Sequence, residues 1–519
     1  MQQRPTTAIL TLLGALTALA AAGQWSETKY SYDRTSDGSM TLDMQRDDWV
    51  VAVPKTWYGE PEARFYERIG GSWYPHLTLR AQAANLTFGT ATTLFGDQAI
   101  ITGLVADGRA IEFDRSNGLW REAGWFQASG LPLGANFGWS AAMDGDWLAV
   151  GAIEPGAWFE SVYLFELNGG VWQERQTLAP SDPGFGIDLF GDAVDLYLDH
   201  ALVGASAHDH LGAEGGGAYL YRNEAGSWSL VDELMPPDLA AGDAFGAAVA
   251  VTSRMALIGA PGRDVPACEG CSVEADAGAA YLFEKVDGSW SPVGWITASD
   301  PRAGDRFGSA VDLNNARAVV GAPGKSDQVA VIDGVDVPAG AVYIFRPDGQ
   351  GWVEHGKLEA SDAPDSIRFG TDVAVYGNRV LVGAPGELGQ SGTRTDAVYL
   401  YEGITCDTDE SAPSWREIDE NWPEIDGVPV REIDITLEDD SGLLALDVGL
   451  AGDVEVEVLD EAHLVHGELL HHAFADLRTN VRVRIRELGD GDYEIIAQDP
   501  CGGDFVVRPE LVDDWLEAF

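Results

Sequence analysis

A Phe-Gly dipeptide recurs along most of this chain and constrains the fold more than any other feature. It occurs in phase at six places, and a glycine follows each copy about fourteen residues later. The last three of these glycines begin the tetrapeptide Gly-Ala-Pro-Gly. A seventh, more divergent copy lies upstream, where Ser39 replaces the phenylalanine. The six phenylalanines are Phe88, Phe137, Phe190, Phe245, Phe307 and Phe369.

A tryptophan after a Gly-containing turn forms a second, independent series. It has seven members, and a short β-type run rich in aromatic residues precedes six of them. Each repeat therefore reads as four strands, A to D; in the sixth repeat these are 310–313, 318–321, 341–345 and a strand that begins near Trp352. The tryptophans are Trp25, Trp73, Trp120, Trp172, Trp228, Trp290 and Trp352.

The phase of the two series predicts how the repeats are arranged. Four-stranded units of about 50 residues, repeated seven times, are typical of a β-propeller. The seventh unit ends at its strand C, whereas residues 25–32 stand alone before the first strand A. We expect an all-β, seven-bladed propeller in which the N-terminal strand 25–32 closes the ring as strand D of the last blade.

These motifs resemble the FG-GAP repeat of integrin α-subunit propellers and of many secreted bacterial proteins. The resemblance covers residues 23–405 and implies a seven-bladed propeller engaged in extracellular adhesion or binding. Many such repeats carry a calcium loop of the form Asp-x-Asp-x-Asp-Gly between strands A and B. None of the corresponding turns here has three alternating carboxylates, and one of them is Asn314-Asn315. We therefore predict neither a metal nor another cofactor in these turns, and calcium stays open only for acidic residues elsewhere.

The two ends of the chain differ from the repeats. Residues 1–22 combine Arg4, an apolar run and small residues, which indicates a signal peptide and hence a secreted, cell-surface or periplasmic protein. No later segment has the roughly 20 apolar residues of a membrane helix. Residues 406–424 read as an acidic linker, and 425–519 as a small β-sandwich. In that domain, if 454–458 pairs with 481–486, rows of Glu and Arg would face each other favourably.

The net charge is strongly negative, with 84 acidic and 32 basic residues giving −52. Nucleic acid is therefore excluded as a partner, because a polyanion is repelled by phosphates. Two interpretations of the charge stay open: a solvated acidic surface, or capture of cations by clustered carboxylates.

Four cysteines occur in a chain that we expect to be exported. Disulfides are then favoured, and the simplest of three pairings joins Cys268 to Cys271 and Cys406 to Cys501. The Cys-x-x-Cys pair is also half of a zinc motif, but no second pair lies nearby in the sequence.

Acidic residues gather in the loops that join strand D to the next strand A. These loops lie at the same end of a propeller as the B–C loops, of which 262–278 and 324–340 are long. His208 and His210 lie in another B–C loop. We predict that this end binds a ligand, whereas the alternative is that each Asp only stabilises its turn. The acidic candidates are Asp182, Asp188, Asp238, Asp243, Asp300, Asp305, Asp362 and Asp365.

No nucleophile elbow, phosphate loop or zinc-protease motif is present in the sequence, and no catalytic residue is predicted. We expect an exported, non-enzymatic binding or adhesion scaffold that presents the acidic loops to an extracellular protein or glycan. The alternatives are an extracellular hydrolase or lyase that uses the same face, and a purely structural cell-surface protein.

Overall fold

The computed structural model describes two groups of residues. In the repeat region they are 25–32, 40–45, 48–53, 62–69, 72–80, 87–104, 108–116, 119–131, 135–153, 161–180, 188–209, 215–266, 272–286, 288–314, 317–326, 329–332, 335–347, 351–362, 368–377, 379–388 and 394–403. In the C-terminal region they are 424–425, 428–435, 444–448, 454–458, 481–489, 492–498 and 504–507.

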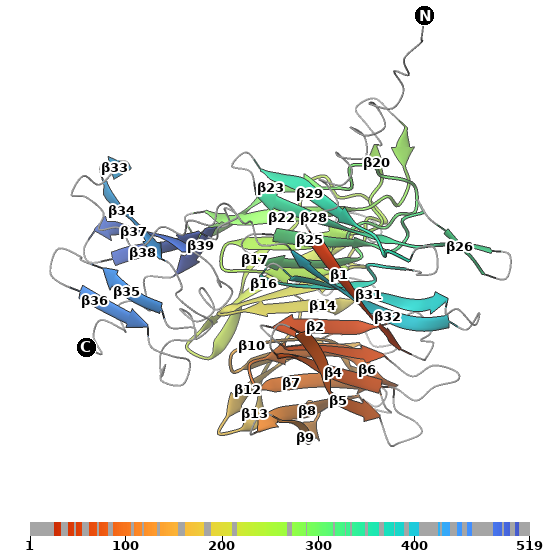
Figure 1. The fold of residues 1–519 in the computed structure, drawn as a ribbon, viewed down its shortest axis with the longest axis horizontal. Helices are drawn as coiled ribbons and strands as arrows, with labels where there is room; N and C mark the ends of the chain where they lie inside the picture. The colour runs from red at the N-terminus through yellow and green to blue at the C-terminus, as the bar shows by residue number, and fades with distance from the viewer. Residues whose placement is uncertain are drawn as a thin grey trace, which may run out of the picture. The chain divides into compact units, whose positions relative to one another are not determined.

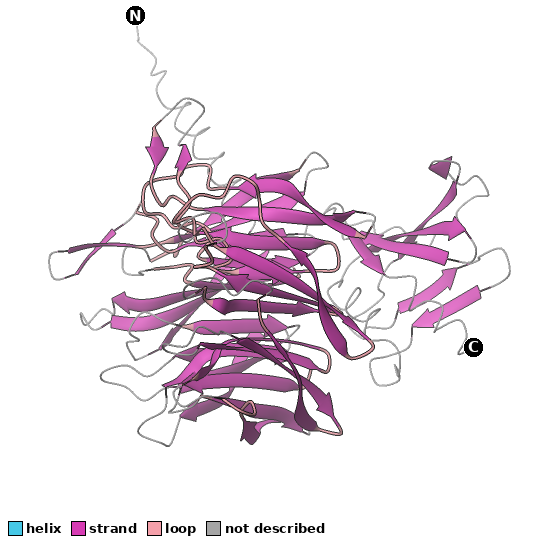
Figure 2. Ribbon diagram, turned by 180° about the vertical axis from the view of Figure 1, so that it is seen from behind, coloured by secondary structure: helices cyan, strands magenta, loops and turns pink. Residues whose placement is uncertain are grey.

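Seven four-stranded antiparallel sheets form the repeat region, so the predicted seven-bladed propeller is confirmed. Figures 1 and 2 show how the strands of these sheets are arranged. Blades 1 to 3 are β2 Thr41–Gln45, β3 Asp48–Val53, β4 Glu62–Ile69 and β5 Ser72–Arg80; β6 Thr87–Phe95, β7 Gln98–Leu104, β8 Arg109–Ser116 and β9 Leu119–Phe126; β10 Asn136–Asp144, β11 Trp147–Ile153, β12 Ser161–Asn168 and β13 Val171–Leu178. Blades 4 and 5 are β14 Phe190–Tyr197, β15 His200–Ala205, β16 Gly217–Glu224 and β17 Ser227–Glu233; β18 Val249–Val251, β19 Met255–Ala260, β22 Ala279–Val286 and β23 Ser289–Ile296. Blades 6 and 7 are β24 Ala310–Asn314, β25 Arg317–Ala322, β28 Ala341–Pro347 and β29 Trp352–Leu358; β30 Asp372–Tyr376, β31 Arg379–Leu388, β32 Arg394–Gly403 and β1 Trp25–Tyr32.

The N-terminal strand β1 lies beside β32, and the two pair antiparallel from Trp25 with Gly403 to Tyr32 with Asp396 (Figure 1). A contact made by strand D of other blades recurs here. Glu354 of β29 accepts hydrogen bonds from the backbone N–H and the hydroxyl of Ser299, at 2.9 and 3.0 Å. Glu27 of β1 accepts the same two bonds from Ser361. By pairing and by this contact, β1 occupies the position of strand D in blade 7.

The two glycines of the repeat motif meet between neighbouring blades. A Cβ atom on Gly259, in strand B of blade 5, would lie 2.0 Å from the carbonyl oxygen of Gly308, in the Phe-Gly of blade 6. Gly308 itself has φ +93°, a left-handed conformation that favours glycine. Gly204 approaches Gly246 in the same way, and Gly321 approaches Gly370. The spacing of the motif therefore reflects backbone contact from blade to blade.

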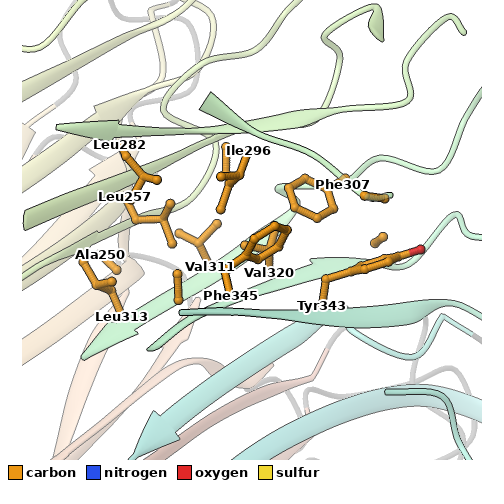
Figure 3. Close-up of a cluster of buried hydrophobic side chains, with 14 of the residues drawn as sticks. Ala250, Leu257, Leu282, Ile296, Phe307, Val311, Leu313, Val320, Tyr343 and Phe345 are labelled. Carbon is orange, nitrogen blue, oxygen red and sulfur yellow. The ribbon is translucent and has the colours of Figure 1, made fainter. Parts of the chain in front are cut away.

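The hydrophobic core lies between blades. Figure 3 shows the layer in which Leu257, Leu282 and Ile296 of blade 5 face Val320 and Phe345 of blade 6. The motif phenylalanines anchor these layers, because their side chains are fully buried and meet an aromatic ring of strand C edge-on or tilted. Those with no exposed area are Phe137, Phe190, Phe245, Phe307 and Phe369.

Two neighbouring blades carry an extra hairpin in their B–C connection. In blade 5, β20 Val265–Pro266 pairs with β21 Val273–Glu274. In blade 6, β26 Val329–Ile332 pairs with β27 Val335–Pro338. Figure 1 shows both hairpins reaching out beyond the blades that carry them. Each of the two long loops of the sequence thus contains a pair of short antiparallel strands.

The chain divides into two compact units, one of which holds the seven blades and ends at Gly403. The other contains a five-stranded sheet and a two-stranded sheet, so the predicted small β-sandwich stays a prediction. The strands of the larger sheet are β33 Glu424–Ile425, β34 Val428–Ile435, β37 Val481–Gly489, β38 Asp492–Gln498 and β39 Asp504–Val507, and those of the smaller are β35 Leu444–Val448 and β36 Val454–Val458.

The pairing considered for two strands of this unit does not occur. Strand β36 pairs with β35, not with β37, so the Glu and Arg rows of 454–458 and 481–486 do not lie on paired strands. Strand β37 pairs with β34 instead, where Arg484 is opposite Glu432 and Arg482 is opposite Asp434. Several alternating segments carry acidic residues, and their alternation alone does not say which of them is the partner.

The predicted signal peptide 1–22 and residues 406–423 of the predicted linker lie outside the described residues, whereas Glu424, the last residue of that linker, begins strand β33. Within the part that the structure describes, no helix is long and apolar enough to cross a membrane.

Candidate functional site

Strand direction places the acidic loops and the extra hairpins at one end of the propeller. In each blade, strands B and D run toward this end, and strands A and C start from it. The D–A and B–C connections therefore share it, and we call it the loop face. The A–B and C–D turns lie at the opposite end, the turn face.

Three of the candidate aspartates on the loop face accept a hydrogen bond from a tyrosine of strand C. Tyr343 donates to Asp300 at 2.7 Å, and Tyr399 donates to Asp362 at 2.8 Å. Tyr281 makes the longer bond to Asp238, at 3.3 Å. The donor and the acceptor hold equivalent places in blades 5, 6 and 7, so this contact is part of the repeat.

Cations complete these contacts. Asp300 lies 3.3 Å from the Nζ atom of Lys325 and 3.1 Å from that of Lys357. Burial alone raises the pKa of Asp300, but the bonds from Tyr343 and Lys357 and the charge of Lys325 outweigh it and lower the pKa to about 2. Asp362 binds Lys29 of β1, and its pKa is lowered for the same reasons. These carboxylates are ionised at neutral pH, and their charge is compensated within the protein.

More deeply buried ion pairs link the D–A loop to the B–C loop in blades 5 and 6. Asp305 has no exposed area and lies 2.8 Å from the Nζ atom of Lys325, and Asp243 lies 3.2 Å from Arg263. Arg263 also binds Asp238 at 2.6 Å. Burial raises the pKa of Asp243 and of Asp305, and the paired cation only partly opposes it. Each aspartate precedes the motif phenylalanine by two residues, and each cation follows the strand-B glycine by four.

In blade 4 the same two positions hold Asp188 and His208. The Nδ1 atom of His208 lies 3.5 Å from Asp188, and its Nε2 atom lies 3.4 Å from the hydroxyl of Tyr219. Asp188 and His208 are 7% and 2% exposed, while the next residue, Asp209, is exposed. Within the described part of the chain, these three residues are the group of His, Cys, Asp and Glu side chains close enough together to hold a metal ion.

The remaining predicted site residues lie outside the described residues. They are Asp182, Asp365, His210, Cys268, Cys271, Cys406 and Cys501. The six described candidate aspartates each contact a tyrosine, a cation or a histidine of this chain. Their geometry favours the alternative reading in which they hold the loops in place.

The sequence reasoning missed three exposed tryptophans on the loop face. Trp125 and Trp295 lie near the end of strand D, and Trp139 lies at the start of strand A, so all three are at this end of their blades. Their exposed fractions are 53%, 38% and 39%. The sequence contained a signal for the first two, because each follows the recurring strand-D tryptophan of its repeat by five residues.

Polar groups hold these indoles in place. The Nε1 atom of Trp139 donates to Asp192 of the next blade at 2.8 Å, and Asp192 also accepts a bond from Ser206 at 2.6 Å. The guanidinium of Arg109 lies 3.9 Å from the ring centre of Trp125. Indoles that are fixed and half exposed can cover an apolar surface without losing much side-chain entropy.

A further set of carboxylates lies in the innermost strands. Aspartates of strand A accept backbone N–H groups from strand A of the adjacent blade, as when Asp312 accepts from Val375 and Asp372 accepts from Leu42. These bonds satisfy N–H groups at the inner edge of each sheet. Burial raises the pKa of Asp312 and Asp372 to about 7 and that of Asp43 to about 6. The pKa of Asp195 is also raised well above its usual value.

Comparisons with known proteins agree with the repeat pattern. The FG-GAP repeat family matches residues 172–221, 228–283, 290–345 and 352–401, each stretch beginning at a strand-D tryptophan. No curated protein matches the chain. Among solved structures, the crystal structure of the Saccharomyces cerevisiae Sqt1 is 11% identical, covering 72% of this chain and 98% of that one with a TM-score of 0.39. A likeness at this level carries no argument about function.

Proposed function

Because this chain is an FG-GAP-repeat β-propeller protein, we propose that it is an exported, non-enzymatic binding or adhesion scaffold whose loop face contacts an extracellular protein or glycan. The fold suits this role, since a closed ring of sheets holds its loops rigidly.

The observation that carries the proposal is the exposure of Trp125, Trp139 and Trp295 on the loop face. Large indoles are costly to leave in water, and in binding proteins they stack on sugar rings or fill apolar pockets of a partner. The turn face mainly exposes scattered aliphatic side chains next to the C–D turns, such as Leu119 and Val171, and among the described residues it exposes one aromatic ring, that of Tyr74, but no indole. Single exposed aliphatic residues are common on protein surfaces and call for no ligand.

The acidic loops have a supporting part in this proposal. Tyrosines and cations fix Asp238, Asp300 and Asp362, so these carboxylates keep the loops rigid beneath the contact surface. The hairpins β20–β21 and β26–β27 widen the same face over blades 5 and 6. Ligand contact would then come from the tryptophans and the hairpins.

Binding of the mature chain to arrays of glycans and extracellular-matrix proteins tests the proposal. The double variant Trp125→Ala/Trp139→Ala removes two exposed rings, and we expect it to weaken binding at least tenfold. Leu119→Ala/Val171→Ala is the matched control, because it truncates two exposed side chains of the turn face. The proposal fails if no array component binds, or if both double variants bind like the parent chain.

The hairpins are tested separately. Val265 is paired with Glu274, and Val329 with Pro338, so a two-residue turn can replace 266–273 or 330–337 while keeping Arg263 and Lys325. Weaker binding with an unchanged melting temperature would assign the hairpins to the contact surface. Unchanged binding would restrict that surface to the tryptophans.

A further inference from the structure

We propose that Asp188, His208 and Asp209 form a binding site for a divalent transition metal of the zinc class, placed between the loop that leads into blade 4 and the B–C loop of that blade. The site does not depend on the proposed binding role, because none of its ligands is a tryptophan or hairpin residue of the loop face.

The donor atoms already have the spacing that such an ion needs. The three side chains each present one ligand atom, and these atoms lie within 4.8 Å of one another. Nδ1 of His208 lies 3.5 Å from a carboxylate oxygen of Asp188. Two ligands of a tetrahedral zinc ion with bonds of about 2.0–2.1 Å are about 3.3 Å apart, so small movements would complete the site.

The other side of the imidazole is arranged as in known histidine ligands. Nε2 of His208 lies 3.4 Å from the hydroxyl oxygen of Tyr219, and the two rings meet edge to face. In a metal-bound imidazole, Nδ1 would coordinate the ion and Nε2 would carry the proton that is donated to this oxygen. A hydrogen bond on the far nitrogen is what fixes the tautomer and the orientation of a metal-bound histidine.

Comparison with the next two blades explains why this position differs from its equivalents. There the buried aspartates, Asp243 and Asp305, form ion pairs with Arg263 and Lys325. Blade 4 keeps the buried aspartate but places an imidazole opposite it, and adds the exposed carboxylate of Asp209. A bound divalent cation would supply the positive charge that a side chain supplies in blades 5 and 6. It would link the same two loops.

Three ligands from nitrogen and oxygen suit zinc better than calcium, which takes six to eight oxygen ligands. Asp209 lies at the solvent side, so the remaining coordination positions are open to water. The proposed site therefore holds a single metal ion that links two loops, and its solvent-facing coordination position is occupied by exchangeable water.

Thermal melting of the full mature chain with added zinc tests the proposal. We expect ZnCl₂ at about 100 times its Kd to raise the melting temperature by several degrees, and MgCl₂ at the same concentration to have no effect. Direct titration by calorimetry should show zinc binding that is lost in His208→Lys. This variant copies the lysine of blade 6, so it should pair with Asp188 and stay folded without zinc.

Two further variants complete the design. Asp209→Asn changes an exposed ligand, so folding should be unaffected while zinc affinity falls at least tenfold; this variant decides the matter if His208→Lys does not fold. His471→Ala/His472→Ala removes two adjacent histidines of the C-terminal segment, far in sequence from His208, and should leave the melting shift unchanged. A shift that survives in both His208→Lys and Asp209→Asn, or no shift in the parent chain, would overturn the proposal.

Discussion

The hydroxyl of Tyr343 donates a 2.7 Å hydrogen bond to the carboxylate of Asp300, and this one contact joins strand C of blade 6 to the loop that leads into that blade. Tyr343 is fully buried, while Asp300 is partly exposed and also binds two lysines. The acidic loops of the propeller are thus ordered by groups that the repeat itself supplies.

Tyr343→Phe should destabilise the protein by about 1–2 kcal/mol, because the charged acceptor loses the hydrogen bond from the buried tyrosine. Tyr281→Phe is the matched control, and its effect should be smaller because its bond to Asp238 is 3.3 Å long. Denaturant unfolding at pH 7 measures both. Equal losses in the two variants would show that the hydrogen bond to Asp300 is not the cause.

Gly259→Ala should destabilise the protein by about 3 kcal/mol or more. The added Cβ atom would lie 2.0 Å from the carbonyl oxygen of Gly308, so two neighbouring blades would have to separate. Gly356→Ala is the control: it lies in β29 with nothing within 4 Å of the added atom, and we expect stability unchanged within about 0.5 kcal/mol. Measuring the melting temperatures of the two variants tests this prediction. Similar values for both would contradict the backbone contact between Gly259 and Gly308.

The same glycines explain why the fold was predictable from sequence. Only a residue without a side chain fits where Gly259 meets Gly308, and only an aromatic ring fills the core at Phe307, so both residue types recur at a fixed spacing. When the same steric requirement recurs in every blade, the same residue types recur in the sequence. Strand pairing within the C-terminal unit has no such signal in the sequence. Strands β36 and β37 alternate apolar and polar residues, and this pattern is compatible with several pairing partners.

The site was less predictable, because its meaning depends on contacts distant in the chain. Asp305 and Lys325 are 20 residues apart, and nothing in the acidic loop alone shows that a lysine neutralises it. Trp139 is one tryptophan among 17, and its exposure follows from its place at the start of strand A. The negative charge of the acidic loops could be seen in the sequence. The pairing of these carboxylates with cations and the exposure of the tryptophan could be seen only in the structure.

Glu27→Ala should destabilise the ring by about 1–2 kcal/mol, since Glu27 accepts hydrogen bonds from Ser361 and from the buried Tyr401. Glu354→Ala removes the equivalent carboxylate of blade 6, which accepts bonds from Ser299, and should cost about 1 kcal/mol. Chemical denaturation of both variants makes the comparison. A loss for Glu354→Ala with none for Glu27→Ala would mean that β1 does not hold blade 7 as β29 holds blade 6.

The inner aspartates predict how stability depends on pH. Burial raises the pKa of Asp312 and Asp372 to about 7 and of Asp43 to about 6, against an ordinary value of 3.8, so the folded state binds more protons than the unfolded state between these limits. Their contribution is complete below about pH 4 and is lost as the pH rises through 6 to 7. Asp300, with a pKa of about 2, works in the opposite direction, but only below about pH 4.

We therefore expect the free energy of unfolding to fall as the pH rises from 5 to 8, and Asp312→Asn to make that slope shallower by up to roughly 1 kcal/mol per pH unit. The slope is the readout because both carboxylate oxygens of Asp312 accept backbone N–H groups, and an amide can replace only one of them, which lowers stability at every pH. Asp209→Asn, which removes one exposed charge, controls for net charge. Urea unfolding at several pH values measures the slopes, and equal slopes in the parent chain and Asp312→Asn would exclude Asp312 as a titrating group, because its protonation would then be the same in the folded and unfolded states.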